Sequence, residues 1–220
     1  KAIDAFIEAV QNDPDTTELH FALGNLFRRR GEFERAVRVH QHLLGRADLK
    51  AGDRDRAQLA LAQDFMKAGL FDRAEAAWHA LEGTPFDGEA RLALLSLYER
   101  SRDWRRAVEV ARVLDRAGGG SFASRIAHYE CEIAEEAEAQ GRSEEAEAAL
   151  QRARKAAPSA PRPLVLAGQR LLRQGQPALA LAAWDTLRER HPAAFLLVAG
   201  DYAAAAAGSD GVDAARAALE

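Results

Sequence analysis

Apolar residues recur along most of this chain at intervals of three and four, which is the spacing of one face of an α-helix. Leu23 and Phe27 form one such stripe, and Ala36, His40 and Leu43 continue the pattern after a polar gap. No run alternates apolar and polar residues for long enough to suggest a strand. The pattern therefore predicts an all-α chain built from short amphipathic helices that are joined by tight turns.

The turns between these helices recur with a regular period. Taking Gly31 as the first turn position, the successive spacings are 38, 33, 39 and 34 residues. The five turn positions are Gly31, Gly69, Arg102, Gly141 and Gly175. An alanine stands five residues after each one, at Ala36, Ala74, Ala107, Ala146 and Ala180. A period near 34 with small residues at fixed offsets is typical of a helix-turn-helix repeat.

The stretch from Leu23 to Ala36 shows why these residue types recur. Gly24 and Ala36 are small enough for two helices to approach closely, Phe27 fills the space beside them, and Gly31 supplies the permissive backbone of the turn. The arrangement resembles a tetratricopeptide repeat (TPR) unit. One helix pair cannot bury both of its apolar stripes, so stacking of units is expected. We predict a right-handed TPR α-solenoid of antiparallel helix pairs.

We expect one solenoid over residues 1–220, and the two longer spacings are explained by insertions in loops around residues 48–53 and 118–121. The chain begins at Lys1 without a methionine and ends inside an amphipathic pattern, so we expect it to be part of a longer protein. Uncapped ends would favour further units or self-association. The predicted units are approximately 1–14 (partial), 17–50, 55–86, 88–119, 127–158, 161–192 and 193–220 (partial).

Composition narrows the possible functions. Thirty basic and thirty-four acidic residues give a net charge of −4, so no global field attracts nucleic acid or an anionic membrane. The single cysteine, Cys131, excludes an intrachain disulfide and is interpreted as a packing residue. The longest apolar run, residues 193–207, is too short to cross a bilayer. The chain has no HExxH, CxxC, GxSxG or phosphate-loop motif, so we expect neither an enzyme nor a bound metal or cofactor.

Charge is nevertheless unevenly distributed along the sequence. Arginines gather between Arg28 and Arg38, whereas the segment Glu130–Glu147 holds eight glutamates and one arginine. Such clusters are either plain solvated faces or a device that orients a charged protein partner. No aromatic platform accompanies the arginines, so RNA is not an expected partner.

The concave face is the extended surface that a solenoid offers to a protein partner. In a TPR unit, this face is lined by the second, fifth, ninth and twelfth residues of the first helix. Asn25 matches the position at which peptide-clamping TPR domains hold a backbone or carboxylate group. His128 is open to a second interpretation, as a surface or packing residue. The candidate groove residues are Glu18, Phe21, Asn25, Arg28, Arg29, Arg56, Gln63, Lys67, Ser96, Glu99, His128 and Glu135.

Three segments carry a closer resemblance. They are LGNLFRRRGEFERAVRVHQHLL within Glu18–Leu44, DFMKAGLFDRAE at Asp64–Glu75 and RIAHYECEIA at Arg125–Ala134. In order and spacing they are similar to repeats of the lipopolysaccharide assembly protein B family (LapB, also called YciM). The resemblance implies a non-enzymatic adaptor at the cytoplasmic face of the bacterial inner membrane, with an N-terminal membrane anchor and a C-terminal rubredoxin-like zinc or iron module outside these residues.

The same resemblance implies the partners. Members of the family control lipopolysaccharide synthesis by promoting degradation of the deacetylase LpxC through the membrane protease FtsH. The alternative is a generic peptide-binding TPR co-chaperone or scaffold that holds a C-terminal peptide through Asn25 and its basic neighbours. An enzyme on a TPR-like scaffold would need a cluster of titratable residues that the sequence does not supply.

Overall fold

The computed structural model describes residues 16–118 and 121–208 of the chain, and every regular element in these ranges is an α-helix. The all-α fold class is therefore confirmed for the described residues. The chain divides into two compact units between Ser101 and Arg102, and each is described here by itself. The predicted partial unit at residues 1–14 and the end of the last unit, from residue 209, lie outside the described ranges. A single solenoid over the whole chain stays a prediction.

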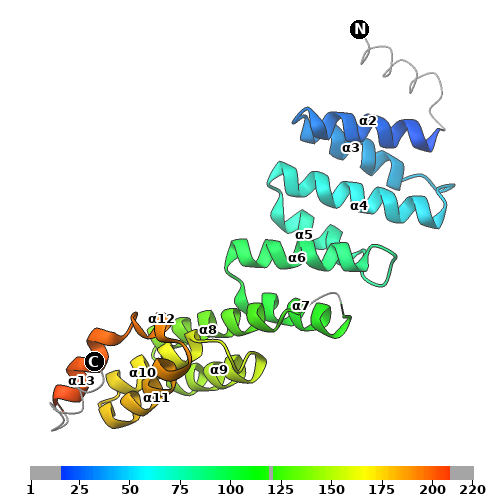
Figure 1. Ribbon diagram of the computed structural model, residues 1–220. Coiled ribbons are helices and arrows are strands. Elements are labelled where there is room, and N and C mark those ends of the chain that lie inside the picture. The colour runs from blue at the N-terminus through cyan, green and yellow to red at the C-terminus, as the bar shows by residue number, and fades with distance from the viewer. Residues whose placement is uncertain (1–15, 119–120, 209–220) are drawn as a thin grey trace. The chain divides into compact units, whose positions relative to one another are not determined.

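The first unit contains helices α2 (Thr17–Arg29), α3 (Phe33–Leu44), α4 (Ala51–Ala68), α5 (Phe71–His79) and α6 (Asp87–Ser101). Each helix packs on the next in chain order, and α2 also contacts α4 (Figure 1). The pairs α2/α3 and α4/α5 are the predicted helix pairs of two repeats. Their first helices, α2 and α4, therefore lie side by side, as a stacked repeat requires.

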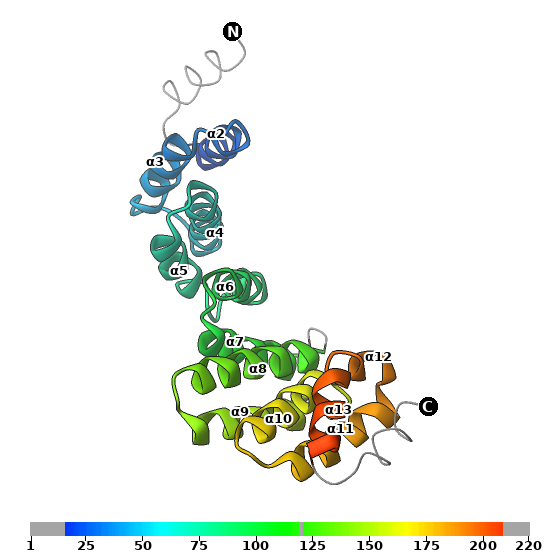
Figure 2. The same ribbon diagram turned by 90° about the vertical axis from the view of Figure 1, so that its left-hand side faces the viewer.

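The second unit contains α7 (Trp104–Arg116), α8 (Ala123–Ala139), α9 (Ser143–Ala156), α10 (Arg162–Arg173), α11 (Pro177–Arg190), α12 (Pro192–Phe195) and α13 (Ala199–Gly208). Helices α8 and α9 form one antiparallel pair, α10 and α11 form the next, and α12 and α13 pack on α11 (Figure 2). The apolar stretch 193–207 is divided between α12 and α13, because Phe195 and Val198 both pack into the core around Trp184.

The predicted turns are present at all five positions. The φ angles are 78° at Gly31, 73° at Gly69, 71° at Gly141 and 71° at Gly175, and Arg102 has a φ of 56°. After each of the four glycines, the next residue donates its N–H to the carbonyl five positions earlier, as Glu32 does to Phe27 at 2.9 Å. This is the Schellman closure of a helix end, which needs a left-handed residue.

The alanines five residues after the turns fix the distance between paired helices. All five are at most 1% exposed. Two of the helix pairs approach more closely still. A methyl group on Gly24 would lie 2.3 Å from His40 Nε2, and one on Gly168 would lie 2.1 Å from Trp184 Nε1. Glycine is therefore required at both positions, because an aromatic ring of the second helix rests on the backbone of the first.

Candidate protein-binding groove

The described part of the first unit carries a hollow of about 300 Å³ between α2 and α4. It combines apolar walls with amide and guanidinium groups, so it offers a ligand both apolar contact and hydrogen-bond donors. Five of the residues predicted for the groove line it. The complete lining is Phe21, Asn25, Arg28, Arg56, Leu59, Ala60, Gln63 and Phe86.

Polar contacts between the first helices shape this hollow. The Arg56 guanidinium lies 4.4 Å from the centre of the Phe21 ring, and its Nη1 donates to Glu18 at 2.8 Å. This hydrogen bond lowers the pKa of the Glu18 carboxyl. Farther along α4, Gln63 Nε2 donates to Glu89 Oε1 of α6 at 3.0 Å. The predicted residues Glu18, Arg56 and Gln63 thus link the first helices of successive repeats.

Arg28 is tied to a buried acid that the sequence analysis missed. Its Nη1 donates to Asp64 Oδ1 at 2.9 Å and its Nη2 to Asn25 Oδ1 at 2.6 Å. Asp64 is completely buried, and its second oxygen lies 2.5 Å from Nδ1 of the buried His40. Arg28 therefore compensates an internal carboxylate and orients the Asn25 amide, so its charge is only partly offered to a ligand.

A second hollow of about 570 Å³ adjoins the first at Gln63. Predicted residue Lys67 lines it, and the Arg100 guanidinium lies 4.7 Å from the centre of the Phe71 ring at its wall. Trp78 also lines this hollow, and its indole Nε1 is buried with no hydrogen-bond partner among the described residues. The full lining is Gln63, Met66, Lys67, Gly69, Phe71, Trp78, Glu89, Ala93 and Arg100.

The remaining predicted residues lie outside these two hollows. Arg29 is exposed on α2, and on α6 Ser96 is exposed and Glu99 is half-buried. His128 and Glu135 belong to the second unit, where Arg162 lies 2.6 Å from His128 Nδ1 and pairs with Glu135. The predicted set therefore gathers mainly in the first unit, around α2 and α4.

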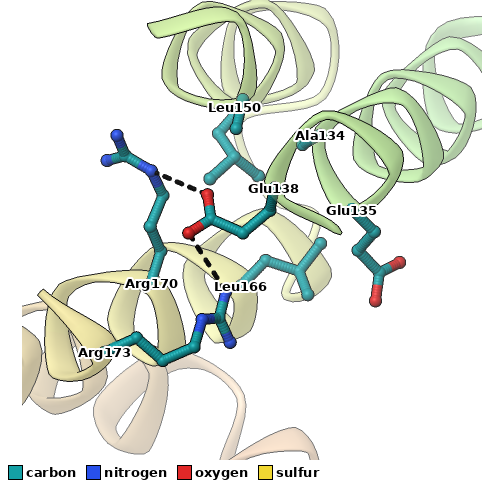
Figure 3. Close-up of a pocket in the computed structure, with 8 residues that line it drawn as sticks. Ala134, Glu135, Glu138, Leu150, Leu166, Arg170 and Arg173 are labelled. Atoms are coloured by element: carbon teal, nitrogen blue, oxygen red, sulfur yellow. Dashed lines mark hydrogen bonds and ion pairs between the residues drawn. The ribbon is translucent and has the colours of Figure 1, made fainter. Parts of the chain in front are cut away.

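In the second unit, the space between α8 and α10 is occupied by ion pairs. The Glu138 carboxylate lies between Arg170, at 3.2 Å, and Arg173, at 3.8 Å (Figure 3). Arg170 also pairs with Glu147 at 2.7 Å. The pocket beside them holds about 20 Å³, which is room for about one water molecule. We therefore assign no ligand to it.

The uneven charge of the sequence is largely balanced in space. Glu130, only 1% exposed, accepts from Arg112 and Arg152, each at 2.9 Å. Other glutamates of the acidic segment pair with Arg105, Arg142, Arg162 and Arg170. In the arginine cluster, Arg30 and Arg35 both bind Glu32. Several of these pairs join different helices, so part of the charge in both clusters is compensated within the fold.

The described residues contain no group of three potential metal ligands and no helix that is long and apolar enough to cross a membrane. Cys131 is completely buried, and burial raises the pKa of its thiol to about 12. Its interpretation as a packing residue agrees with both observations.

Comparison with known families decides the class of the protein. Two family models, both described as tetratricopeptide repeat, match residues 19–55 and residues 59–122 and 131–163, together more than half of the chain. The chain belongs to the tetratricopeptide repeat family. A solved TPR protein from Parabacteroides merdae is similar over 99% of this chain and 90% of its own, with 15% identity and a TM-score of 0.46.

Among curated proteins, this TPR chain is similar to lipopolysaccharide assembly protein B. The Escherichia coli K12 protein is 42% identical over 135 residues, which are 61% of this chain and 35% of that protein. The Haemophilus influenzae protein is 30% identical over 201 residues, which are 87% of this chain and 50% of that protein. The chain is therefore a LapB homologue, as its sequence predicts, and it spans between about a third and half of these relatives.

Proposed function

We propose that this TPR chain is the partner-binding part of a non-enzymatic adaptor that regulates lipopolysaccharide biosynthesis. The observation that carries the proposal is the hollow between α2 and α4, which is lined by Phe21, Asn25, Arg56 and Gln63, in a chain homologous to LapB. Its apolar and hydrogen-bonding groups suit a polypeptide, and no titratable group in it is arranged as a nucleophile with a base.

The proposed partners are LpxC, FtsH or both. An adaptor that holds LpxC near the protease raises the effective concentration of substrate at the protease and so promotes its degradation without any chemistry of its own. The proposed location is the cytoplasmic face of the bacterial inner membrane. The membrane anchor and the rubredoxin-like metal module of the family would belong to parts of the protein other than these residues.

The groove assignment needs a variant that leaves the fold intact. Arg28 is unsuitable because it compensates the buried Asp64. Arg56 and Gln63 are better targets, since the Arg56 side chain is 44% exposed and Gln63 makes only a surface contact with Glu89. The double variant Arg56→Glu/Gln63→Ala should therefore change the groove without disturbing the core.

The test is retention of purified LpxC and of the soluble FtsH protease domain on immobilised chain. We expect retention by the wild type, at least a tenfold loss in the double variant and no loss in Arg106→Glu, a matched change at an exposed arginine of α7. Unchanged retention by the double variant would remove the groove assignment. If neither protein is retained and a short peptide binds only with its C-terminal carboxylate free, the chain is a generic peptide-binding TPR.

A further inference from the structure

The hollow between α2 and α4 has a layer of polar residues beneath its surface. Asn25 lies on the lining, and Arg28 connects it to Asp64, which in turn contacts His40. Asp64 and His40 are both completely buried, and the Arg28 side chain is only 19% exposed. Polar side chains from α2, α3 and α4 thus form one continuous chain of contacts from the groove into the core.

Arg28 determines which way the Asn25 amide faces. A guanidinium group only donates hydrogen bonds, so the Asn25 atom that lies 2.6 Å from Arg28 Nη2 is the oxygen Oδ1. No described residue accepts a hydrogen bond from the Nδ2 group of Asn25, although this side chain lines the hollow. The groove therefore presents Asn25 as a donor, and the matching group on a partner is a carbonyl or carboxylate oxygen.

Arg28 is fixed by two acceptors on α4. Its Nη1 donates to Asp64 Oδ1 at 2.9 Å and to the carbonyl of Ala60 at 3.0 Å. Asp64 is fixed from the other side by His40, whose Nδ1 lies 2.5 Å from Oδ2. The Nε2 of His40 packs against Gly24 and has no hydrogen-bond partner among the described residues. The polar contact of His40 is thus with Asp64, and the position of Arg28 depends on a carboxylate in the core.

Packing alone does not require this polar layer. Other repeats of the chain place apolar residues at the three equivalent positions, counted from the turn or from the alanine that follows it. These residues are Met66 in place of Arg28, Leu150 in place of His40 and Leu97 in place of Asp64. Burying charged groups costs desolvation that apolar residues of similar size avoid. The layer therefore needs a reason other than stability, and it ends at the groove, on Asn25.

We propose that Asp64, supported by His40, is a positioning residue of the groove: it holds Arg28 so that the Asn25 amide keeps its N–H donors available to a bound protein segment. The groove then selects a segment that offers a carbonyl or carboxylate oxygen at this point. The proposal rests on the function proposed above, since it assumes that the groove binds protein. It adds two buried residues that act on the partner through Arg28 and Asn25.

The order of the Asn25 side chain can be measured in the free protein. The chain has two asparagines, so labelling with ¹⁵N-asparagine gives two side-chain amide signals, and Asn25→Ala identifies one of them. The test variant is Asp64→Leu/His40→Phe, which gives the core apolar residues as in the other repeats. We expect its thermal midpoint to be unchanged or higher. Its Asn25 amide should become mobile, which lowers the ¹⁵N heteronuclear NOE.

The affinity for purified LpxC tests whether this order affects binding. We expect Asp64→Leu/His40→Phe to bind about tenfold more weakly, as for the loss of one hydrogen bond. When Asn25→Ala is already present, the same double change should alter the affinity by less than about twofold, because Asp64 acts through Asn25. A purely structural role of Asp64 would give the same loss in both backgrounds.

Two further variants separate the amide donors from the buried charge. Asn25→Asp keeps an oxygen for Arg28 and removes the N–H donors, so the thermal midpoint should not fall while the affinity falls about tenfold. Glu130→Gln is the matched control, because it alters a buried carboxylate that binds Arg112 and Arg152 in the second unit. It should lower the midpoint and leave the affinity unchanged.

An Asn25 amide that stays ordered in Asp64→Leu/His40→Phe, or wild-type affinity in Asn25→Asp, would overturn the positioning role. The function proposed above fails separately. If Asp64→Leu/His40→Phe binds LpxC as the wild type does while Arg56→Glu/Gln63→Ala loses it, the positioning role is wrong and the adaptor stands. If the wild type retains neither LpxC nor FtsH, the named partners are wrong, and the NOE of the Asn25 amide alone decides whether Asp64 positions it.

Discussion

Replacing Gly168 by alanine tests the close contact that sets the spacing of α10 and α11. The added methyl carbon would lie 2.1 Å from Trp184 Nε1, 2.3 Å from Cε2 and 2.7 Å from Cδ1. Trp184 is fully buried in a cluster that includes Leu187, Phe195 and Tyr202. The indole therefore has no open space to move into, and the helices must separate or the ring must change its pose.

The expected cost follows from three contributions. Alanine is favoured over glycine inside a helix by about 1 kcal/mol, which would stabilise the variant. Overpacking a rigid core costs about 1–3 kcal/mol. Moving the indole also breaks the 3.3 Å hydrogen bond to Val165 and leaves a buried donor unpaired, which costs about 1–3 kcal/mol more. We therefore expect Gly168→Ala to lower the free energy of unfolding by about 3 kcal/mol.

The assay is thermal and urea unfolding followed by circular dichroism at 222 nm. At about 2–4 °C per kcal/mol for a chain of this size, the midpoint should fall by about 6–12 °C. Gly200→Ala is the matched control, because it lies in a helix of the same unit and its added methyl meets nothing within 4 Å. It should leave the midpoint unchanged or raise it slightly.

A double-mutant cycle identifies the cause. If the loss comes from the contact with the indole, Gly168→Ala combined with Trp184→Leu should cost less than the two single changes added together. Strict additivity, or a Gly168→Ala midpoint equal to that of Gly200→Ala, would refute the argument. The same reasoning would then fail for Gly24 and His40.

Four further predictions test separate features. Arg102→Gly should raise the free energy of unfolding by about 1 kcal/mol in a urea titration, because a non-glycine residue at a φ of 56° is strained; a lower value would contradict this. Asp64→Ala should lower the free energy of unfolding by about 3–5 kcal/mol in the same assay, because it removes the buried carboxylate that binds Arg28 and His40. A loss below about 1 kcal/mol would refute this role of Asp64. Cys131, buried and with its pKa raised to about 12, should react with a thiol reagent at pH 8 only after unfolding, and rapid native reaction would show that it is accessible. Hydrogen bonds from Arg91 and a backbone N–H lower the pKa of Asp87 in the folded state, so the ionised carboxylate stabilises the fold fully above its unfolded pKa of about 4, and this stabilisation is lost as the pH falls through the folded pKa. In Asp87→Asn the urea midpoint should therefore change less between about pH 4 and pH 2 than in the wild type. An equal change in both proteins would exclude this role.

The periodic features of the fold could be predicted from the sequence because they depend on local chemistry. Glycine tolerates a positive φ at a turn and alanine permits two helices to approach closely, so both residue types recur in the sequence at a fixed spacing. Even Arg102 could be placed at a turn, because Ala107 follows it by five residues and the turns before and after it lie about one repeat length away. The break in the stretch 193–207 could not, because it depends on Phe195 and Val198 packing around Trp184, which lies on another helix.

The groove could be predicted in part for the same reason. Counting along the first helices placed Phe21, Asn25 and Arg56 around one hollow. The count could not show that Arg28 is held by Asp64. A signal for Asp64 was nevertheless present, because it lies three and four residues after Leu61 and Ala60 on the apolar face of its helix. A carboxylate on such a face requires a cation from another helix, as the structure shows.

The same reasoning extends to the ring position on the second helix of each pair. A large ring there needs a glycine on the facing helix, as in Gly24 with His40 and Gly168 with Trp184. Where the facing residue is alanine, a smaller side chain fits, as in Ala134 with Leu150. Ala62 with Trp78 breaks this complementarity, and Trp78 is the tryptophan whose buried nitrogen has no partner among the described residues. Packing alone would favour a smaller residue at this position, because the enclosed indole donor has no acceptor.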